Sequence, residues 1–456
     1  MLPIRHPMPF LSWLGLAFGL ALGLAPHLAS PVAAQEPPPP AVDPAADAPT
    51  TASITDAAPT APPEPAEPPI DPQRLRGHHW IIDRTDLWQR SDNLLWNFHN
   101  LSQFSVIHEP DDAAYPFKAL FHGWPTHDQP TTGGAIFLAR SPAIDAGWEV
   151  FAGVHPTSGT LIWDAQMDPT LWRPVMQPGA ADYAALQLSD PSLVKVGGRY
   201  LCALTAVGPN TDGIASGLPG DIDGNLTCIA GAVSEDLVHW TLAPEPLLLN
   251  PADREPFEPG MLRNHYFGSY QRPALLARDD GFDLWFNYEQ PNDIAMGHAI
   301  NRGDFLNRED WRLVRAGADP CLSSFPNPDV VRIGGLLYAF ADPLRYGIHP
   351  WRGRWLTEAV SADGRNWIVL GHIKPDPDAT ANQVPQALVL DDGDGVPRVC
   401  VFYSNQLSAP EGQPYDARMQ RIRVLTRPIT RLETEFYTRL LGQAAAGLAG
   451  GGGTRP

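Results

Sequence analysis

A short phrase recurs along the chain: a residue followed by proline, an apolar run, a tight turn and a second apolar run. Its two clearest copies are residues 190–203, Asp-Pro-Ser-Leu-Val-Lys-Val-Gly-Gly-Arg-Tyr-Leu-Cys-Ala, and residues 327–340, Asn-Pro-Asp-Val-Val-Arg-Ile-Gly-Gly-Leu-Leu-Tyr-Ala-Phe. Apolar runs joined by Gly-Gly are typical of β-hairpins. Looser copies begin at Tyr115-Pro116, Arg272-Pro273 and Val384-Pro385. Such a repeat limits the possible folds more than composition does.

Each copy has a second half that also recurs. Residues 232–240 and 359–367 both begin with Ala-Val-Ser and end with Trp, and looser versions cover 136–148 and 295–311. Trp240 and Trp367 are 127 residues apart across two repeats, and about 63 residues per repeat is room for four short strands. Five such units arranged radially make an all-β, five-bladed β-propeller. A β-sandwich with accidental internal similarity is the alternative.

In the propeller interpretation, the innermost strand of each blade follows its X-Pro pair. The five inner strands are therefore expected near residues 116–122, 191–196, 273–278, 328–333 and 385–390.

The phrase Asp190-Pro-Ser-Leu-Val with Gly-Gly-Arg-Tyr, followed by Ser234-Glu-Asp-Leu-Val-His-Trp240, resembles the blade signature of family 43 glycoside hydrolases. It is also similar to the related propellers of families 32, 62, 68 and 130. The resemblance covers roughly Phe104 to Thr426 as a repeat pattern. It implies the propeller architecture and an action on poly- or oligosaccharide, although a shared fold by itself specifies activity poorly.

The residues that precede proline are the first candidates for a site. Because the chain enters every inner strand at the same face of a propeller, these residues are expected to form one ring at an end of the central channel: Tyr115, Asp190, Arg272, Asn327 and Val384. Glycoside hydrolysis requires two carboxyls, one protonated and one ionised. The resemblance implies a base Asp on the first blade, with an Asp and an acidic Glu on other blades. This ring departs from that set, since its only carboxylate is Asp190.

Asp190 is therefore the candidate base, and Arg272 is expected within its reach. Arg272 would hold Asp190 ionised, clamp an anionic substrate group, or form a purely structural ion pair between blades. Glu258, between Phe257 and Pro259 in the connection to the third repeat, is the candidate acid, because apolar neighbours favour a protonated carboxyl. An exposed loop carboxylate is the alternative. The expected substrate-binding residues are Tyr115, Trp124, Arg272 and Asn327.

The ends of the chain differ from its middle. Arg5 and His6 precede an apolar run from Phe10 to Leu24, which is the layout of a secretory signal peptide over residues 1–34. Residues 35–72 are rich in Pro and Ala with scattered acids and predict an extended spacer. The propeller is expected over 73–432 and a tail over 433–456, disordered from Gln443. We expect a secreted or periplasmic protein, without a transmembrane segment and monomeric.

The formal net charge is −19, and −13 remains after Arg5 and the seven acids of the spacer are removed. A strongly acidic surface argues against nucleic acid and anionic membranes as partners and is compatible with neutral sugars or cations. No cofactor is expected. Residues 220–225 alternate acidic and amide side chains, so a structural calcium ion and a plain polar turn both stay open. Cys202 and Cys228 either form a disulfide across a hairpin or stay free and buried with the other two cysteines.

Two functions follow from these observations, and a third is less favoured. The first is an exported glycoside hydrolase that uses Asp190 as base and Glu258 as acid. The second is a carbohydrate-binding propeller that has lost the acid pair. The third is a phosphorolytic relative in which one carboxyl acts together with phosphate held by Arg272.

Overall fold

The structure is a computed structural model, and it describes twelve stretches of the chain: residues 82–93, 96–98, 102–123, 134–209, 225–249, 270–290, 293–316, 319–343, 354–376, 381–391, 395–406 and 420–450. All of them belong to one compact unit that spans Glu67–Pro456. The expected signal peptide and spacer lie outside these stretches. Among the described helices, none is long and apolar enough to cross a membrane.

The strands form five antiparallel sheets, which we call blades 1 to 5. Blade 1 contains β3 (Ser102–His108), β4 (Phe117–Gly123), β5 (Ala135–Ser141), β6 (Glu149–Val154) and β7 (Leu161–Asp164), and blade 2 contains β8 (Gln187–Val196), β9 (Arg199–Pro209), β10 (Asn225–Ser234) and β11 (Trp240–Leu242). Blade 3 contains β12 (Tyr270–Arg278), β13 (Gly281–Gln290), β14 (Asp293–Asn301) and β15 (Trp311–Arg315). Blade 4 contains β16 (Asp329–Ile333), β17 (Leu336–Ala341), β18 (Leu356–Ser361) and β19 (Trp367–Ile373). Blade 5 contains β20 (Ala381–Leu390), β21 (Arg398–Gln406) and β22 (Gln420–Pro428), with β1 (Gln89–Arg90) and β2 (Trp96–Phe98).

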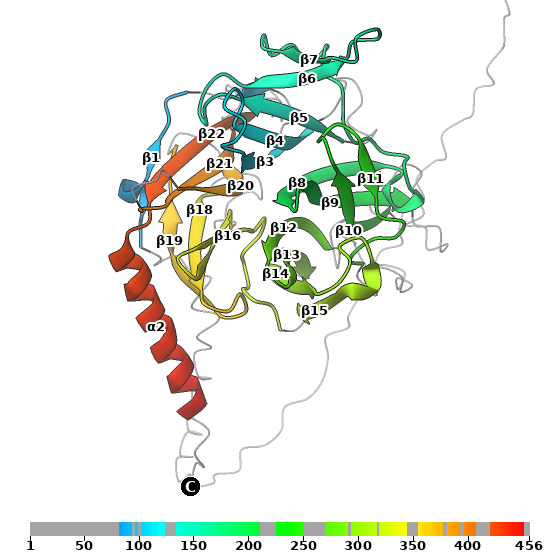
Figure 1. Ribbon diagram of the computed structural model, residues 1–456. Coiled ribbons are helices and arrows are strands. Elements are labelled where there is room, and N and C mark those ends of the chain that lie inside the picture. The colour runs from blue at the N-terminus through cyan, green and yellow to red at the C-terminus, as the bar shows by residue number, and fades with distance from the viewer. Residues whose placement is uncertain are drawn as a thin grey trace, which may run out of the picture. The chain divides into compact units, whose positions relative to one another are not determined.

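The blades are arranged in a circle. The strands β3, β8, β12, β16 and β20 each stand at one end of their sheet, and each contacts the corresponding strand of the next blade, with β20 returning to β3 (Figure 1). These five strands surround the centre of the molecule. The chain is therefore a five-bladed β-propeller, as the repeat predicted.

The circle is closed by strands from the two ends of the described chain. The N-terminal strands β1 and β2 pair with β22, where Gln89 lies opposite Thr426 and Trp96 lies opposite Ile422. Blade 5 is thus completed by residues that precede blade 1 in the sequence.

The core consists of apolar layers between neighbouring blades rather than one central cluster. The layer between blades 3 and 4, for example, contains Trp285 and Trp367, whose ring centroids are 6.1 Å apart at an interplanar angle of 85°. Each blade must therefore be apolar on both faces, which explains the near-continuous apolar runs of its middle strands.

The recurring Ser and Trp have a structural role that the repeat did not specify. Ser361 Oγ accepts a hydrogen bond from the backbone N–H of Gly364 at 2.9 Å, and Trp367 Nε1 donates to the Gly364 carbonyl at 3.0 Å. Ser234 and Trp240 make the same two bonds around Leu237, at 2.9 and 2.7 Å. These pairs lock the tight turn that leads into the outermost strand.

The prediction for blade 1 was wrong in one respect. Its innermost strand is β3, and the predicted inner strand near residues 116–122 is β4, the second strand of the blade. The inner strands of the other four blades contain the predicted segments within one residue. The cause is that β3 has no proline: its phrase begins Gln103-Phe104, and the X-Pro pair Tyr115-Pro116 directly precedes β4.

The structure decides between the two alternatives for the cysteines, and it differs from expectation at the C-terminus. Cys228 lies opposite Ala206 in the ladder, four residues along β9 from Cys202, which separates the two by about 13 Å and excludes a bond between them. All four cysteines are free and buried. The expected disorder from Gln443 is contradicted up to Gly450, because α2 spans Arg431–Gly450. Alanine, which is frequent there, is the strongest helix former.

Candidate functional site

Five residues at the start of the inner strands share a backbone conformation that side chains rarely adopt. Their φ angles are 47° for Gln103, 54° for Asp190, 52° for Arg272, 54° for Asn327 and 49° for Val384. In β3, β8, β12 and β20 the pairing with the next strand skips a position at this point. Left-handed backbone at a non-glycine residue costs of order 1–3 kcal/mol and recurs where function or packing requires it. We call these five residues the channel ring.

The preceding blade holds most of these strained positions in place. Thr205 Oγ1 accepts a hydrogen bond from the Arg272 backbone N–H at 2.7 Å, and Asn287 Oδ1 accepts one from Asn327 N–H at 2.6 Å. Asp342 Oδ2 accepts the third, from Val384 N–H at 2.9 Å. Each acceptor lies on or just after the second strand of its blade. A second set of polar groups therefore surrounds the channel ring and fixes it.

Asp190 and Arg272 lie within reach of each other, as predicted. Arg272 Nε is 3.8 Å from Asp190 Oδ2, and Arg272 Nη1 donates to Asn327 Oδ1. Asp190 is 6 % exposed, and its carboxylate also accepts from Ser189 Oγ at 3.2 Å. Three members of the ring thus form one polar chain across blades 2, 3 and 4, in which the guanidinium balances the carboxylate.

Asp342 is a second carboxylate near the ring, but its acceptor positions are occupied. Asn327 Nδ2 donates to Oδ1 at 2.6 Å, and Arg354 Nη1 lies 3.2 Å from Oδ2, which also receives the Val384 N–H. Burial raises the pKa of the Asp342 carboxyl, and Arg354 opposes that effect. We assign Asp342 to the support of the ring rather than to chemistry.

His122 occupies on β4 the position that Thr205 occupies on β9, as the ladder register shows. Burial lowers the pKa of His122 to about 4; the charge of Arg272 lowers it as well, and Asp190 opposes both. The imidazole is therefore neutral at neutral pH. Gly134 makes room for it, because a Cβ at residue 134 would lie 1.9 Å from His122 Nε2.

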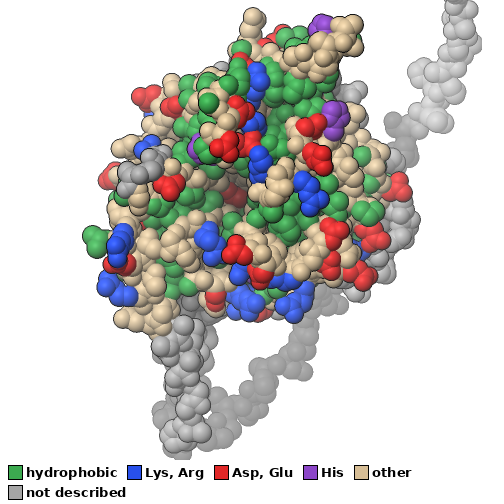
Figure 2. Space-filling model, in the orientation of Figure 1, with side chains coloured by type: hydrophobic (Ala, Val, Ile, Leu, Met, Phe, Trp, Pro, Cys, Tyr) green, Lys and Arg blue, Asp and Glu red, His purple; other side chains and the backbone are tan. Residues whose placement is uncertain are grey.

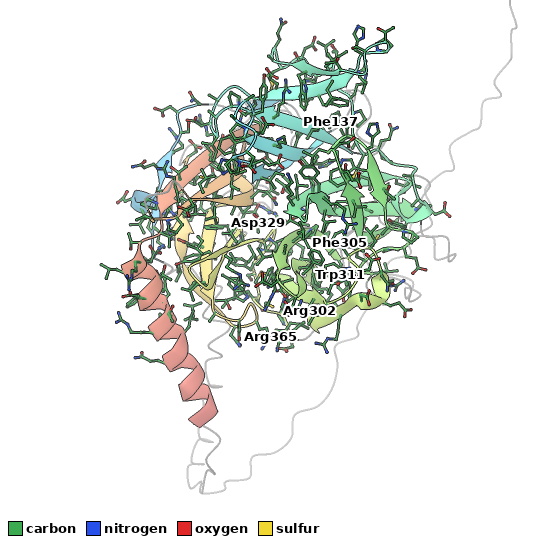
Figure 3. All side chains as sticks on the ribbon, in the orientation of Figure 1. Phe137, Arg302, Phe305, Trp311, Asp329 and Arg365 are labelled. Carbon is green, nitrogen blue, oxygen red and sulfur yellow. The ribbon has the colours of Figure 1, made fainter. Side chains whose placement is uncertain are left out.

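Asp329 stands two residues beyond the ring on β16 and joins blade 4 to blade 5. Its carboxylate accepts a hydrogen bond from the backbone N–H of Ala387 on β20. Ser105 and Ser192 hold the equivalent positions and accept from Leu193 N–H at 2.9 Å and Leu275 N–H at 2.8 Å. Burial raises the pKa of Asp329 to about 7, which the two backbone N–H groups of Ala387 and Val330 only partly offset. Figure 3 places Asp329 near the centre of the propeller.

Tyr115 does not belong to the ring, contrary to the prediction. It lies in the connection between β3 and β4, near the pair His108–Phe117 at one end of that hairpin, while the ring is at the other end, near the pair Ser102–His122. There its ring stacks on Arg140 at 3.7 Å, and its hydroxyl donates to Glu149 Oε1 at 3.3 Å. Glu258 and Trp124 lie outside the described residues.

Gln103 is the fifth member of the ring and was missed. The only signal for it is the serine two residues on, since Gln103-Phe104-Ser105 aligns with Asp190-Pro191-Ser192 once proline is ignored. Gln103 is 1 % exposed, and within the described part of the chain neither its Nε2 nor its Oε1 has a hydrogen-bond partner. A buried amide without partners is uncommon in folded proteins.

The ring thus offers one carboxylate, one guanidinium and two amides. Within the stretches that the structure describes, no three His, Cys, Asp or Glu side chains are grouped as metal ligands. The view in Figure 2 shows acidic and basic side chains interspersed, and the surface is hollowed near its middle. Such a site suits a largely neutral ligand with many hydroxyls.

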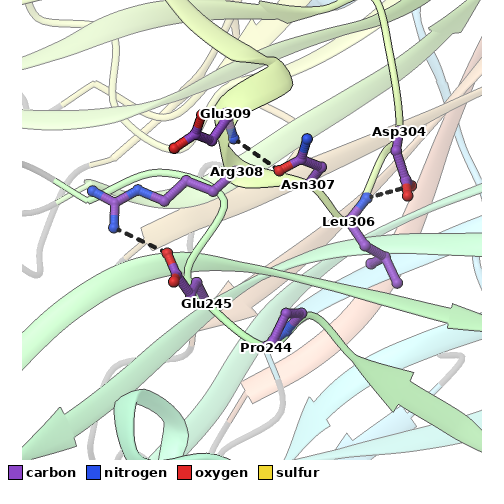
Figure 4. A pocket seen from close by; sticks show the side chains of 7 residues that line it. All are labelled: Pro244, Glu245, Asp304, Leu306, Asn307, Arg308 and Glu309. Carbon is purple, nitrogen blue, oxygen red and sulfur yellow. Dashed lines mark hydrogen bonds and ion pairs between the residues drawn. The ribbon is translucent and has the colours of Figure 1, made fainter.

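Two cavities lie at the rim and share no residue with the ring. One, of about 320 Å³, lies where Glu245 after β11 meets the short 3-10 helix Arg308–Asp310 (Figure 4). Its walls include an ion pair between Arg308 and Glu245 at 3.6 Å. The other, of about 540 Å³, lies beside Trp88 and Ile373. Neither contains the convergent polar groups found in the ring.

The sequence matches no protein-family model and no curated protein. The structure is similar to a solved glycoside hydrolase, with 13 % identity, a TM-score of 0.50, and coverage of 77 % of this chain and 94 % of the other. It is also similar to a thermostable family-43 glycoside hydrolase (11 % identity, TM-score 0.43, 75 % and 96 % coverage). A third similar structure is an N-acetylgalactosamine deacetylase from F. plautii in complex with blood group B trisaccharide (14 % identity, TM-score 0.46, 75 % and 96 % coverage). At 13 % identity, the first of these matches supports a similarity of fold and nothing finer.

Proposed function

We propose that the protein is an exported glycoside hydrolase that binds a poly- or oligosaccharide at the channel ring. The observation that carries the proposal is the set of five strained residues, which brings Asp190, Arg272 and Asn327 together at one end of the inner strands. Strain repeated at one place in every blade is retained where a site must be held rigidly. The proposed leader over residues 1–34 would bring the enzyme to extracellular polysaccharide.

In the proposed reaction, Asp190 is the base. Its carboxylate is buried beside Arg272 and receives the Ser189 hydroxyl, so it is fixed in orientation and electrically balanced. A general base held in this way can take a proton from an attacking water molecule. Arg272 and Asn327 would position the sugar, and Trp124 would stack on its ring.

The acid is proposed to come from the connection between β11 and β12, where Glu258 is the candidate. That connection enters blade 3 just before Arg272, so its residues are close in sequence to the ring. Asp342 cannot take this role, because its oxygens are engaged by Asn327, Arg354 and the Val384 N–H.

A carbohydrate-binding propeller without catalysis is the second candidate, and Gln103 favours it. The resemblance to family 43 implies a base Asp on the first blade, whereas this chain has an amide at the ring position of blade 1. An amide cannot act as a general base. The binding function would keep the ring and its rigidity without a turnover step.

The test is to incubate the full-length protein with arabinan, xylan, galactan, fructan and agarose, with and without phosphate, and to measure reducing ends and binding. Release of reducing sugar supports the hydrolase. Release of sugar phosphate only with phosphate present supports phosphorolysis. Binding without release supports the binding propeller, and neither binding nor release contradicts a carbohydrate function.

A further inference from the structure

The amide of Gln103 is an anomaly that the proposed function does not yet use. Both of its polar atoms are buried, and neither has a hydrogen-bond partner among the described residues. Leaving one buried polar group without a hydrogen bond costs about 1–3 kcal/mol. The backbone of the same residue is left-handed, with φ 47°, which adds to the cost because glutamine seldom adopts that region. Leucine would fill similar space at position 103 without an unpaired donor or acceptor.

The position of Gln103 directs its side chain toward the site. It begins β3 at the point that Asp190, Arg272 and Asn327 occupy in blades 2, 3 and 4, with the same sign and size of φ. Among those three, the Arg272 side chain contacts both Asp190 and Asn327. Residues two positions further along face the next blade instead, as the bonds of Ser105 and Ser192 demonstrate. Its equivalent position therefore places Gln103 with the other members of the channel ring, where the proposed sugar would bind.

We propose that Gln103 is a specificity-determining residue that binds two neighbouring hydroxyl groups of an uncharged sugar, and this inference rests on the proposed function. A primary amide presents one acceptor and one donor side by side. A vicinal diol matches it, since one hydroxyl donates to Oε1 while the adjacent hydroxyl oxygen accepts from Nε2. Binding of such a diol would give both polar atoms of the amide a hydrogen-bond partner.

The charges of the ring select an uncharged sugar over a uronate or sulfate. Arg272 is already engaged with Asp190 and Asn327, and the charges of Asp190 and Arg272 balance. An anionic group would have to compete with Asp190 for the guanidinium among largely buried side chains, where an unbalanced charge is costly.

The experiment measures binding by calorimetry with methyl glycosides of arabinose, xylose, galactose and fructose, and with methyl galacturonoside as the anionic probe. The tightest neutral ligand is then compared with its monodeoxy derivatives, using the full chain and Gln103→Leu. We expect the unmodified protein to bind one pair of deoxy sugars about tenfold to a hundredfold more weakly than the parent sugar, and Gln103→Leu to abolish that difference.

Gln386→Leu is the matched control. Gln386 is also buried on an inner strand and has an unpaired Nε2, but it stands at the position that faces the neighbouring blade. We expect this variant to keep the deoxy-sugar discrimination. Gln103→Glu provides a second test if Gln103→Leu does not fold: it removes the donor and should weaken binding of the same neutral sugar about tenfold.

The outcomes separate the inference from the function on which it rests. If the unmodified protein binds a neutral sugar and the Gln103 variants discriminate deoxy sugars as it does, Gln103 does not bind the sugar hydroxyls. The inference is then overturned while the carbohydrate function stands. Tighter binding of the galacturonoside also overturns it. If no sugar binds to the unmodified protein, the proposed function fails, and the inference fails with it.

Discussion

Asp329 on β16 joins blade 4 to blade 5 through the backbone N–H of Ala387, at a position where Ser192 joins blade 2 to blade 3 through Leu275 N–H. A carboxyl therefore makes a bond for which a hydroxyl suffices. Because burial raises the pKa of Asp329 to about 7, the native state holds this proton more tightly than the unfolded chain between about pH 4 and pH 7. The stability that Asp329 contributes should therefore fall as the pH rises from about 4 to about 7.

The change Asp329→Ser should remove this pH-dependent loss while keeping the bond between blades. Asp329 by itself is expected to contribute a loss of up to a few kcal/mol of unfolding free energy from pH 4 to pH 7, at about 1.4 kcal/mol per unit of pKa difference. Over that range the unfolding free energy of the variant should therefore become larger, relative to that of the unmodified protein, by the same amount. Urea unfolding at pH 4, 5.5 and 7 measures the difference. The control variant Ser105→Ala should lower the unfolding free energy by the same amount at every pH. A difference between Asp329→Ser and the unmodified protein that does not change with pH would refute the titration.

His122 should change the stability of the protein with pH in the opposite direction to Asp329. Its native pKa of about 4 lies below the ordinary value of 6.5, so the unfolded chain binds more protons between these values, and stability is lost as the pH falls from 6.5 to 4. His122→Asn should therefore retain more stability at pH 4.5 than the unmodified protein, relative to pH 7.5, by about 1.4 kcal/mol per unit of pKa difference as an upper limit. Thr205→Val, at the equivalent position in blade 2, should instead cost the same at both pH values. Equal acid sensitivity of His122→Asn and the unmodified protein would contradict a neutral buried His122.

Asp190→Asn should distinguish catalysis from binding. It keeps the size of the side chain and removes the base, so turnover of any polysaccharide that the protein cleaves should fall by about a hundredfold to ten-thousandfold, with binding little changed. Initial rates and calorimetric titration provide the two readouts. Asp279→Asn, in the exposed turn before β13, serves as the control and should retain full activity. Unchanged turnover in Asp190→Asn would rule out Asp190 as the base.

Glu358 anchors the C-terminal part of the propeller and offers a stability prediction. It is fully buried, its Oε2 receives Arg84 Nε at 2.9 Å, and its Oε1 pairs with Arg427, which is itself buried. Glu358→Gln should cost about 3–5 kcal/mol, because it removes a fully buried carboxylate shared by Arg84 and Arg427 and leaves Glu433 as the remaining carboxylate beside the buried Arg427 guanidinium. Glu435→Gln, whose partner Arg431 is 91 % exposed, should cost less than 1 kcal/mol. Chemical denaturation at neutral pH tests both, and similar small losses would show that Arg427 finds enough compensation in Glu433.

The repeat predicted four of the five blades closely because each begins with a proline, which fixes the phase of the pattern. Blade 1 lacks this proline, and there the prediction moved one strand outward, replacing Gln103 by Tyr115. The contact of Asp190 with Arg272 could be predicted, because it needs only neighbouring blades and equivalent positions. The roles of His122 and Asp342 could not be predicted. They depend on which residue of a blade's second strand lies beside a residue of the channel ring. That register depends on irregular strand pairing, which the sequence does not reveal. The predicted acid Glu258 and the stacking residue Trp124 stay predictions.

The pairing of β1 and β2 with β22 has a consequence for how the chain acquires its fold. These partners are separated by more than three hundred residues, so their loop closure is entropically the most demanding in the domain. During synthesis the first-made strands must wait for the last-made one, and until then blade 5 presents open hydrogen-bonding edges to other chains. A chain cut before residue 420 has no partner for β1 and β2. Truncation before residue 420 should therefore cause aggregation. Removal of only the residues after α2 should leave the circle of five blades closed.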